Sequence, residues 1–180
     1  MRTIFLIRHC QAEGQEPEAR LTEAGEKQAR ELAAFLKNSQ IDYIVSSPFE
    51  RAVSTIGPFA VEAGIEVETD ERLSERVLSG APHPDWLNML KKSFNDPDLA
   101  FDGGESGGAA AKRGVEVIIE VQGKPAENVA IVTHGNLMAL ILKHYDESYG
   151  FEQWKALSNP DVYEIHIDGE KTKIKRIWGL

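Results

Sequence analysis

Three short apolar runs, each leading into a segment with helical character, constrain the fold more than any other feature of this sequence. The runs lie within residues 3–7, 41–46 and 128–133, at positions 4–7, 43–45 and 129–132, and short apolar runs are typical of buried strands. Strands that alternate with helices predict an α/β fold of three layers, in which helices cover both faces of a mostly parallel central sheet. Ligands of such sheets bind beyond the carboxyl ends of the strands, so the residues that follow the three runs are the candidates for function.

The segments between these runs predict the remaining elements. Residues 22–37 place apolar side chains at every third or fourth position, which predicts an amphipathic helix with its first residue as N-cap. A second helix is expected from Ser47 as N-cap and Pro48 as first helical residue to residue 63, with a kink at Pro58. The other expected helices cover residues 84–94, 109–121 and 136–144, and the other expected strands cover residues 66–69, 162–167 and 173–178.

Composition limits the class of protein and its partners. A chain of 180 residues suits one domain, and no apolar run reaches the length that crosses a bilayer. The formal net charge is −9 and no basic patch stands out, which argues against nucleic-acid binding. Cys10 is the single cysteine, which excludes an internal disulfide and paired-cysteine zinc sites and favours a cytoplasmic location. A monomer and a homodimer both fit the sequence.

Cationic side chains follow all three apolar runs. Arg8 and His9 follow the first run, Arg51 lies just beyond the second, and His134 and Gly135 follow the third. If the strands are parallel, these residues meet at one edge of the sheet, where the free N–H groups of a helix N-terminus also favour an anion. Guanidinium groups bind phosphate oxygens in pairs. Each residue alone is unremarkable, and their convergence is what predicts a pocket for a phosphate dianion.

Six short motifs occur in an order that resembles the histidine phosphatase superfamily, in its phosphoglycerate-mutase-like branch. They are Leu6-Ile-Arg-His-Cys10, Leu21-Thr-Glu-Ala-Gly25, Ser46-Ser-Pro-Phe-Glu-Arg-Ala52, Leu73-Ser-Glu75, Gly103-Gly-Glu-Ser106 and Val132-Thr-His-Gly135. The resemblance covers about three quarters of the chain. It implies a single catalytic domain over residues 1–180 with a phosphoglycerate-mutase-like fold, and a small helical rim or lid at about residues 76–108.

The resemblance also implies a role for each matching residue. His9 looks like the nucleophile, Arg8, Arg51 and His134 look like the phosphate clamp, and Glu75 looks like the proton donor to the leaving group. The implied activity is hydrolysis of small phosphate monoesters through a phosphohistidine, with neither a metal nor a cofactor. A neutral imidazole suits this chemistry, because it is a good nucleophile near pH 7.

The sequence departs from the family pattern beside the nucleophile. Cys10 stands where a glycine or alanine is usual, and Gln15 replaces an asparagine that often touches phosphate, so Gln15 is the expected substrate-binding residue there. Three glutamates, Glu13, Glu16 and Glu18, follow in the same loop, and we expect them to point into solvent. A cysteine-phosphatase mechanism is rejected, because the position six residues after Cys10 holds Glu16 in place of the required arginine.

Two other functions remain open. A cofactor-dependent phosphoglycerate mutase is the main alternative, although the segment from residue 76 to 102 is shorter than the corresponding insertion of the larger mutases. A non-catalytic phospholigand-binding protein is less favoured, because both His9 and Glu75 are present. Glu75 taken alone reads as a surface carboxylate paired with Arg76. The apolar stripe of residues 86–94 is expected to pack on the core, and the natural substrate stays open.

Overall fold

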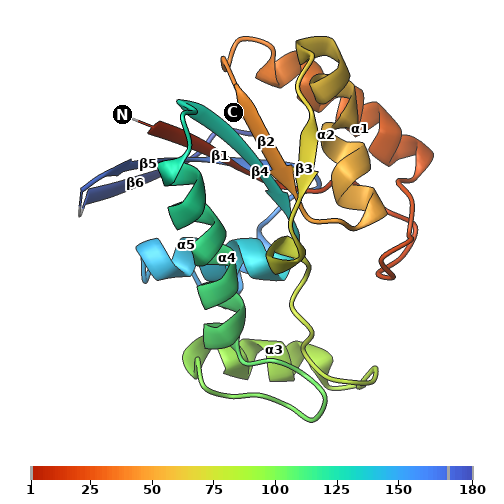
Figure 1. Ribbon diagram of the computed structural model, residues 1–180. Coiled ribbons are helices and arrows are strands. Elements are labelled where there is room, and N and C mark those ends of the chain that lie inside the picture. Colours follow the sequence, from red (N-terminus) through yellow and green to blue (C-terminus); the bar gives the residue numbers. More distant parts are fainter. Residues whose placement is uncertain (1, 170, 180) are drawn as a thin grey trace.

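The computed structural model describes residues 2–169 and 171–179, which form a six-stranded sheet flanked by helices (Figure 1). The strand order is β3-β2-β4-β1-β5-β6. The strands are β1 (Arg2–Arg8), β2 (Tyr43–Ser46), β3 (Val67–Thr69), β4 (Asn128–Thr133), β5 (Asp161–Asp168) and β6 (Lys171–Arg176). Strands β1 to β4 are parallel to one another, and β5 and β6 are antiparallel additions at one side. The prediction of a mostly parallel sheet is therefore confirmed.

The helices cover both faces of the sheet, as the sequence predicts. They are α1 (Glu23–Leu36), α2 (Glu50–Ala63), α3 (Trp86–Asn95), α4 (Gly107–Gly123), α5 (Gly135–Tyr145) and α6 (Phe151–Lys155), with a 3₁₀ turn at Glu71–Leu73. Figure 1 shows α1 and α2 on one side of the sheet and α4 and α5 on the other. Strand β1 serves both cores, because Phe5 and Ile7 pack with α1 and α2, whereas Ile4 and Leu6 pack with α4 and α5.

Two helix boundaries differ from the prediction. Helix α2 begins at Glu50 with Phe49 as N-cap, because Ser47 remains at the end of β2 and its hydroxyl bonds to a histidine of the neighbouring strand end. Helix α4 begins at Gly107, two residues before the expected start, because the hydroxyl of Ser106 accepts the Ala109 N–H and caps it. Pro58 lies inside α2 as expected. The short turn at Glu71–Leu73 and helix α6 were not predicted.

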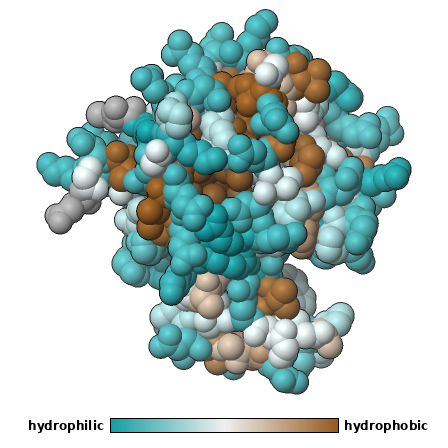
Figure 2. All heavy atoms as spheres, viewed as in Figure 1, coloured by the Kyte–Doolittle hydropathy of each residue, from teal (hydrophilic) through white to brown (hydrophobic). Residues whose placement is uncertain are grey.

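The rim segment, residues 76–106, projects from the body of the molecule. Figure 2 shows it as a separate lobe, which Figure 1 identifies as α3 and its two flanking loops. Aromatic side chains join α3 to α6, since Phe94 lies 6.4 Å from Phe151 and Trp86 lies 6.3 Å from Trp154 between ring centroids. Within the predicted apolar stripe, Phe94 is buried, but Trp86 is 48% exposed, so the expected packing on the core holds only in part.

None of the helices in residues 2–169 and 171–179 combines the length and apolar character that crossing a bilayer requires.

Candidate active site

The carboxyl ends of β1, β2 and β4 bring the predicted residues together. The three strands are adjacent and in register, with Arg8 opposite Thr133 and Ser46 opposite Val132. The residues that follow are therefore at one edge of the sheet: His9 after β1, Arg51 in the first turn of α2, and His134 as the N-cap of α5. The His9 and His134 rings are 5.1 Å apart between centroids. The predicted convergence is confirmed.

The surroundings of His9 determine which nitrogen is free to react. Its Nδ1 lies 2.7 Å from the carbonyl oxygen of Cys10, which can only accept, so Nδ1 carries the proton. Its Nε2 accepts a hydrogen bond from Nε of Arg51 at 3.3 Å and so presents a lone pair. Burial lowers the pKa of His9 to about 4, and the charges of Arg51 and Arg8 act in the same direction. His9 is therefore a neutral base with Nε2 directed toward Arg51.

His134 is also held neutral. Its Nε2 lies 2.8 Å from the hydroxyl of Ser47, and its Nδ1 has no hydrogen-bond partner among the residues described. Burial lowers its pKa to about 2, with further contributions from His9 and Arg51. His134 is the N-cap of α5, and the Asn136 and Leu137 N–H groups of the first turn of that helix are bound by the Glu75 carboxylate.

Arg8 is fixed on one side and free on the other. Its Nη1 donates to the carbonyls of Leu157 and Ser158 at 3.2 and 3.3 Å. Its Nε is buried and has no partner within the described part of the chain. A Cβ placed on Gly135 would lie 2.9 to 3.0 Å from Nε, Cζ and Nη2, so the guanidinium packs directly on this glycine. The Nε–Nη2 edge is therefore available to a phosphate, and Gly135 is required for its position.

Arg51 connects His9 to the loop that follows it. Its side chain is 1% exposed, and its Nη1 donates to the carbonyl of Glu16 at 2.8 Å. The side chains of Glu13, Glu16 and Glu18 are exposed, as expected. Gln15 is also exposed, and within the described residues no hydrogen bond joins it to His9, Arg51 or His134. The structure thus does not bring Gln15 into the cluster, because the loop turns its side chain to solvent.

Glu75 lies at the N-terminus of α5, although 60 residues separate it from that helix. Its Oε2 accepts the Asn136 N–H at 3.0 Å, and its Oε1 accepts the N–H groups of Leu137 and Arg76 at 2.9 and 2.8 Å. The reading of Glu75 as a surface carboxylate paired with Arg76 is wrong, since the Arg76 guanidinium binds the Glu105 carbonyl and the Ser93 hydroxyl. The Glu75 charge acts on Arg8 and Arg51 as well as on Arg76, and it opposes the lowering of their pKa values by burial.

Arg113 holds the segment that carries Glu75. From α4, its Nη1 donates to the carbonyls of Arg72 and Ser74 at 2.6 and 2.8 Å. The same guanidinium forms an ion pair with Glu105 at 2.5 Å. Glu105 belongs to the Gly103–Ser106 motif, whose role the sequence alone did not reveal. In the structure this motif links the rim segment to the loop that presents Glu75.

Cys10 is packed away from the reacting atoms. Its side chain is fully buried and clusters with Leu21 and Ala29, and its N–H donates to the Thr55 hydroxyl at 2.8 Å. Burial raises the pKa of the Cys10 thiol to about 11. The thiol is therefore protonated at neutral pH, which agrees with the rejection of a cysteine-phosphatase mechanism.

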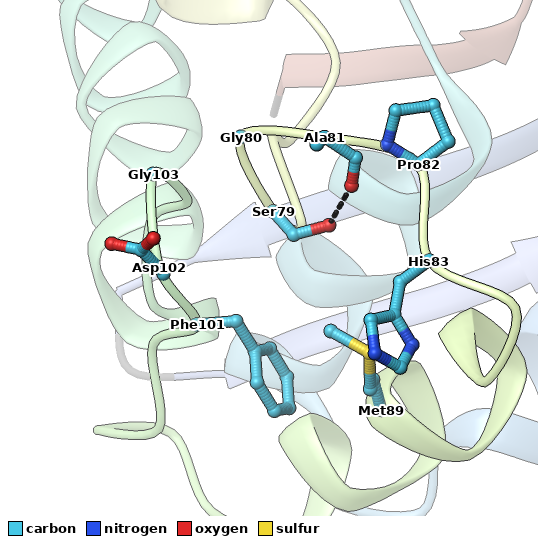
Figure 3. A pocket seen from close by; sticks show the side chains of 9 residues that line it. All are labelled: Ser79, Gly80, Ala81, Pro82, His83, Met89, Phe101, Asp102 and Gly103. Carbon is cyan, nitrogen blue, oxygen red and sulfur yellow. Dashed lines mark hydrogen bonds between the residues drawn. The ribbon is translucent and has the colours of Figure 1, made fainter.

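The rim segment contains a cavity of about 700 Å³ (Figure 3). It is lined by Ser79, Gly80, Ala81, Pro82, His83, Met89, Phe101, Asp102 and Gly103. Figure 3 shows the His83 ring beside Met89, with Phe101 opposite, so the two loops that flank α3 form its walls. The structure places His83 in this wall. The lining includes none of the strand-end residues.

Four polar residues near the cluster were missed from the sequence. Ser47 binds His134, Asn136 has a buried amide oxygen with no partner among the described residues, Arg113 holds the Glu75 segment, and Asn159 binds the His9 carbonyl. The position of Asn136 just after His134-Gly135 was a usable signal. Arg113 and Asn159 gave none, because their partners are distant in sequence. Within the described residues, no group of three or more histidine, cysteine or acidic side chains is placed to hold a metal ion.

The two neutral histidines predict that stability falls with acid. Between pH 7.5 and 5.5 the unfolded chain binds protons at these imidazoles with a pKa near 6.5, whereas the folded chain does not, since its values are about 4 and about 2. The free energy of unfolding should therefore fall by about 1.4 kcal/mol for each histidine over this range. Urea unfolding at the two pH values measures the change. His9→Gln should remove about half of it, and His144→Gln, at an exposed position, should leave it intact. An unchanged pH dependence in His9→Gln would contradict the assignment.

Comparison with known proteins agrees with the fold and the motifs. The family model of the histidine phosphatase superfamily (branch 1) matches residues 4–178. The putative phosphoserine phosphatase 2 of Hydrogenobacter thermophilus is 29% identical over 97% of this chain and 94% of its own length. The mycobacterial glucosyl-3-phosphoglycerate phosphatase, solved with inorganic phosphate, superimposes with a TM-score of 0.79 at 25% identity, over 100% of this chain and 98% of that one.

A phosphoserine phosphatase from Entamoeba histolytica, solved as a histidine-to-alanine mutant with phosphoserine, has the same fold, with a TM-score of 0.75 at 21% identity over 97% of this chain and 95% of that one. The family match spans nearly all of the sequence, and the structural matches reproduce the central sheet and its flanking helices. The chain therefore belongs to the histidine phosphatase superfamily, branch 1, and is an enzyme of the histidine phosphatase type.

Proposed function

We propose that this protein hydrolyses phosphate monoesters of small molecules through a phosphohistidine formed at Nε2 of His9, with Glu75 as the proton donor. The observation that carries the proposal is the state of His9, which is neutral, protonated at Nδ1 and presents its Nε2 lone pair to Arg51. An imidazole in this state is a nucleophile that needs no further activation. The surrounding donors form a pocket suited to a phosphate dianion.

Substrate binding releases the nucleophile. In the free protein, Nε of Arg51 donates to His9 Nε2. A phosphate oxygen carries more charge than a neutral imidazole nitrogen and is the stronger acceptor. Arg51 would turn its N–H to the phosphate, together with the free Nε–Nη2 edge of Arg8 and the Nδ1 side of His134. The Nε2 lone pair is then directed at phosphorus.

Two displacements complete the reaction. In the first, Glu75 enters as the neutral carboxyl group, a state that the neighbouring phosphate dianion favours. His9 Nε2 forms a bond to phosphorus, the bond from phosphorus to the leaving oxygen breaks, and that oxygen takes the proton of Glu75. In the second, water attacks phosphorus, Glu75 takes the proton from this water, and the bond to Nε2 breaks to release phosphate. Oε2 of Glu75 accepts one hydrogen bond, from the Asn136 N–H, so this oxygen has a second lone pair that can hold the transferred proton. The clamp stabilises the charge on the three equatorial oxygens in both steps.

The leaving group would extend toward the rim segment. Ser79, which lines the rim cavity, is four positions after Glu75 in the chain. An extended chain spans at most about 3.5 Å per residue, so the two residues are within about 14 Å of each other. The relatives are named for phosphoserine and glucosyl-3-phosphoglycerate, and both compounds carry a carboxylate near the phosphoester. We therefore propose phosphorylated hydroxy acids as the first substrates to test.

The test is phosphate release from p-nitrophenyl phosphate, phosphoserine and 3-phosphoglycerate in the presence of EDTA. We expect turnover that the chelator does not reduce, and release of phosphate that is faster than any interconversion of 2- and 3-phosphoglycerate. Faster interconversion would support the mutase alternative. Activity that EDTA abolishes and a divalent cation restores would refute the metal-independent mechanism. Binding of phosphate with no turnover of any ester would favour a phospholigand-binding protein.

A further inference from the structure

The loop between α6 and β5, residues 156–160, lies against the nucleophile from the far end of the sequence. The side-chain amide of Asn159 donates to the carbonyl of His9 at 2.9 Å, across 150 residues of chain. In the same loop, the carbonyls of Leu157 and Ser158 accept Nη1 of Arg8. One short loop therefore contacts both the backbone of the nucleophile and the side chain of the adjacent clamp residue.

The carbonyl of His9 is at a position where the sheet no longer supplies a partner. The pairing of β1 with β5 ends at Arg8, opposite Asp161. Beyond that point the His9 N–H still donates to the Thr133 carbonyl at 3.1 Å, but the His9 carbonyl is bound by Asn159. The next N–H, that of Cys10, donates to the Thr55 hydroxyl of α2. Because the His9 carbonyl and the Cys10 N–H belong to one peptide unit, that unit is held at both ends by side chains.

The loop is itself rigidly held. The carboxylate of Asp161, which is fully buried, accepts the N–H groups of Ser158 and Val162 at 2.9 and 3.0 Å. Arg176 of β6 pairs with the same carboxylate at 2.7 Å. The Ser158 hydroxyl donates to the Pro160 carbonyl at 2.6 Å. A buried network in which each polar group has a partner holds its members in one arrangement, so Asn159 is presented to His9 from a fixed base.

We propose that Asn159 is a positioning residue for the nucleophile: its amide fixes the peptide after His9 and thereby aims the imidazole at phosphorus. This inference rests on the proposed function of His9. The imidazole leaves the chain at the residue whose carbonyl Asn159 holds, and its Nδ1 bonds to the next carbonyl, that of Cys10. Rotation of the intervening peptide would change both the direction of the ring and its bond to Cys10. Arg51 and His134 come from other elements and keep their positions.

The expected effect is therefore on the chemical step and not on binding. Asn159→Asp retains the shape of the side chain but sets a carboxylate oxygen against the His9 carbonyl, and Asn159→Ala removes the donor. A misplacement of about 1 Å in a reacting group lowers the rate by about 100-fold. We expect kcat on p-nitrophenyl phosphate to fall by about that factor in both variants, and KM to stay within about threefold, because the clamp side chains remain.

The experiment compares kcat, KM and the rate of phosphoenzyme formation in a rapid alkaline quench for wild type, Asn159→Asp, Asn159→Ala and Asn38→Asp. Asn38 is an exposed asparagine in the turn after α1 and provides the matched control. Assays run about 10 °C below the lowest melting temperature of the set, so that loss of folded protein does not enter kcat. A slower phosphorylation step with KM retained supports the proposal.

Three results would overturn the proposal. They are a kcat within threefold of wild type in Asn159→Asp, an increase in KM with kcat retained, and an equal loss in Asn38→Asp. A variant that does not fold even at low temperature would show a structural role and would also overturn it. Failure of the proposed function is distinguishable from these results, because the wild-type protein would then release no phosphate under the same conditions.

Discussion

Replacing His9 with glutamine is expected to lower the rate of phosphate release by at least about 10⁴-fold, which is typical for the loss of a covalent nucleophile. Glutamine keeps a polar side chain at the strand end but has no nitrogen lone pair of comparable basicity. Two of the neighbouring side chains are not available to take over the attack. The Cys10 thiol is buried and protonated, and the Ser47 hydroxyl is engaged with His134.

The measurement pairs steady-state kinetics with a direct search for the intermediate. Wild-type protein quenched during turnover of a ³²P-labelled ester should carry label that survives alkali and is lost in acid, as expected for a phosphorus–nitrogen bond, and His9→Gln should carry none. His144→Gln, on an exposed position of α5, should behave as wild type. Loss of a nucleophile is expected to leave a residual rate well below one hundredth of the wild-type rate. If His9→Gln retained more than about one hundredth of that rate, His9 would not be the nucleophile and the proposed reaction would be wrong.

Arg51→Ala is expected to produce the second-largest loss, about 10³-fold in kcat/KM. Arg51 hydrogen-bonds to the His9 imidazole through Nε, while its Nη1 donates to the Glu16 carbonyl. Removal of the Arg51 guanidinium leaves His9 Nε2 and the Glu16 carbonyl without this donor. It also removes a fixed positive charge from the site. Arg51→Lys should recover little, because an ammonium group cannot make both contacts at once.

The pH dependence gives this variant a second signature. The Arg51 charge contributes to the lowering of the His9 pKa. The acid limb of kcat/KM should therefore move to higher pH in Arg51→Ala, since a higher pKa means that His9 is protonated, and inactive, at a higher pH. Arg30→Ala, on the exposed face of α1, provides the control. An acid limb that does not move, or a loss smaller than tenfold, would contradict the placement of Arg51 beside His9.

The sequence was sufficient for the elements and for the cluster at the strand ends. Apolar runs of three or four residues mark β1, β2 and β4, because strands buried on both faces need apolar side chains at successive positions. Parallel pairing then brings their carboxyl ends together whatever the details of the packing, so the convergence of His9, Arg51 and His134 was predictable. The predicted first residues of α2 and α4 were wrong because a serine near a helix start can either cap the helix or bind another group. Ser47 binds His134, whereas Ser106 caps α4, and the spatial neighbours of each serine decide which occurs.

The helices, the strands and the motifs at their ends were thus determined by the sequence itself, because each of them depends on residues that are close together in the chain. Only the tertiary structure decided the state of the site. Glu75 is placed by N–H groups of α5, the His9 carbonyl by Asn159, and Gln15 is turned to solvent by its loop. The protonation of both histidines is likewise a property of burial, which depends on every element that covers them. Contacts between groups 60 to 150 residues apart leave no local pattern, since they arise when the sheet and helices pack.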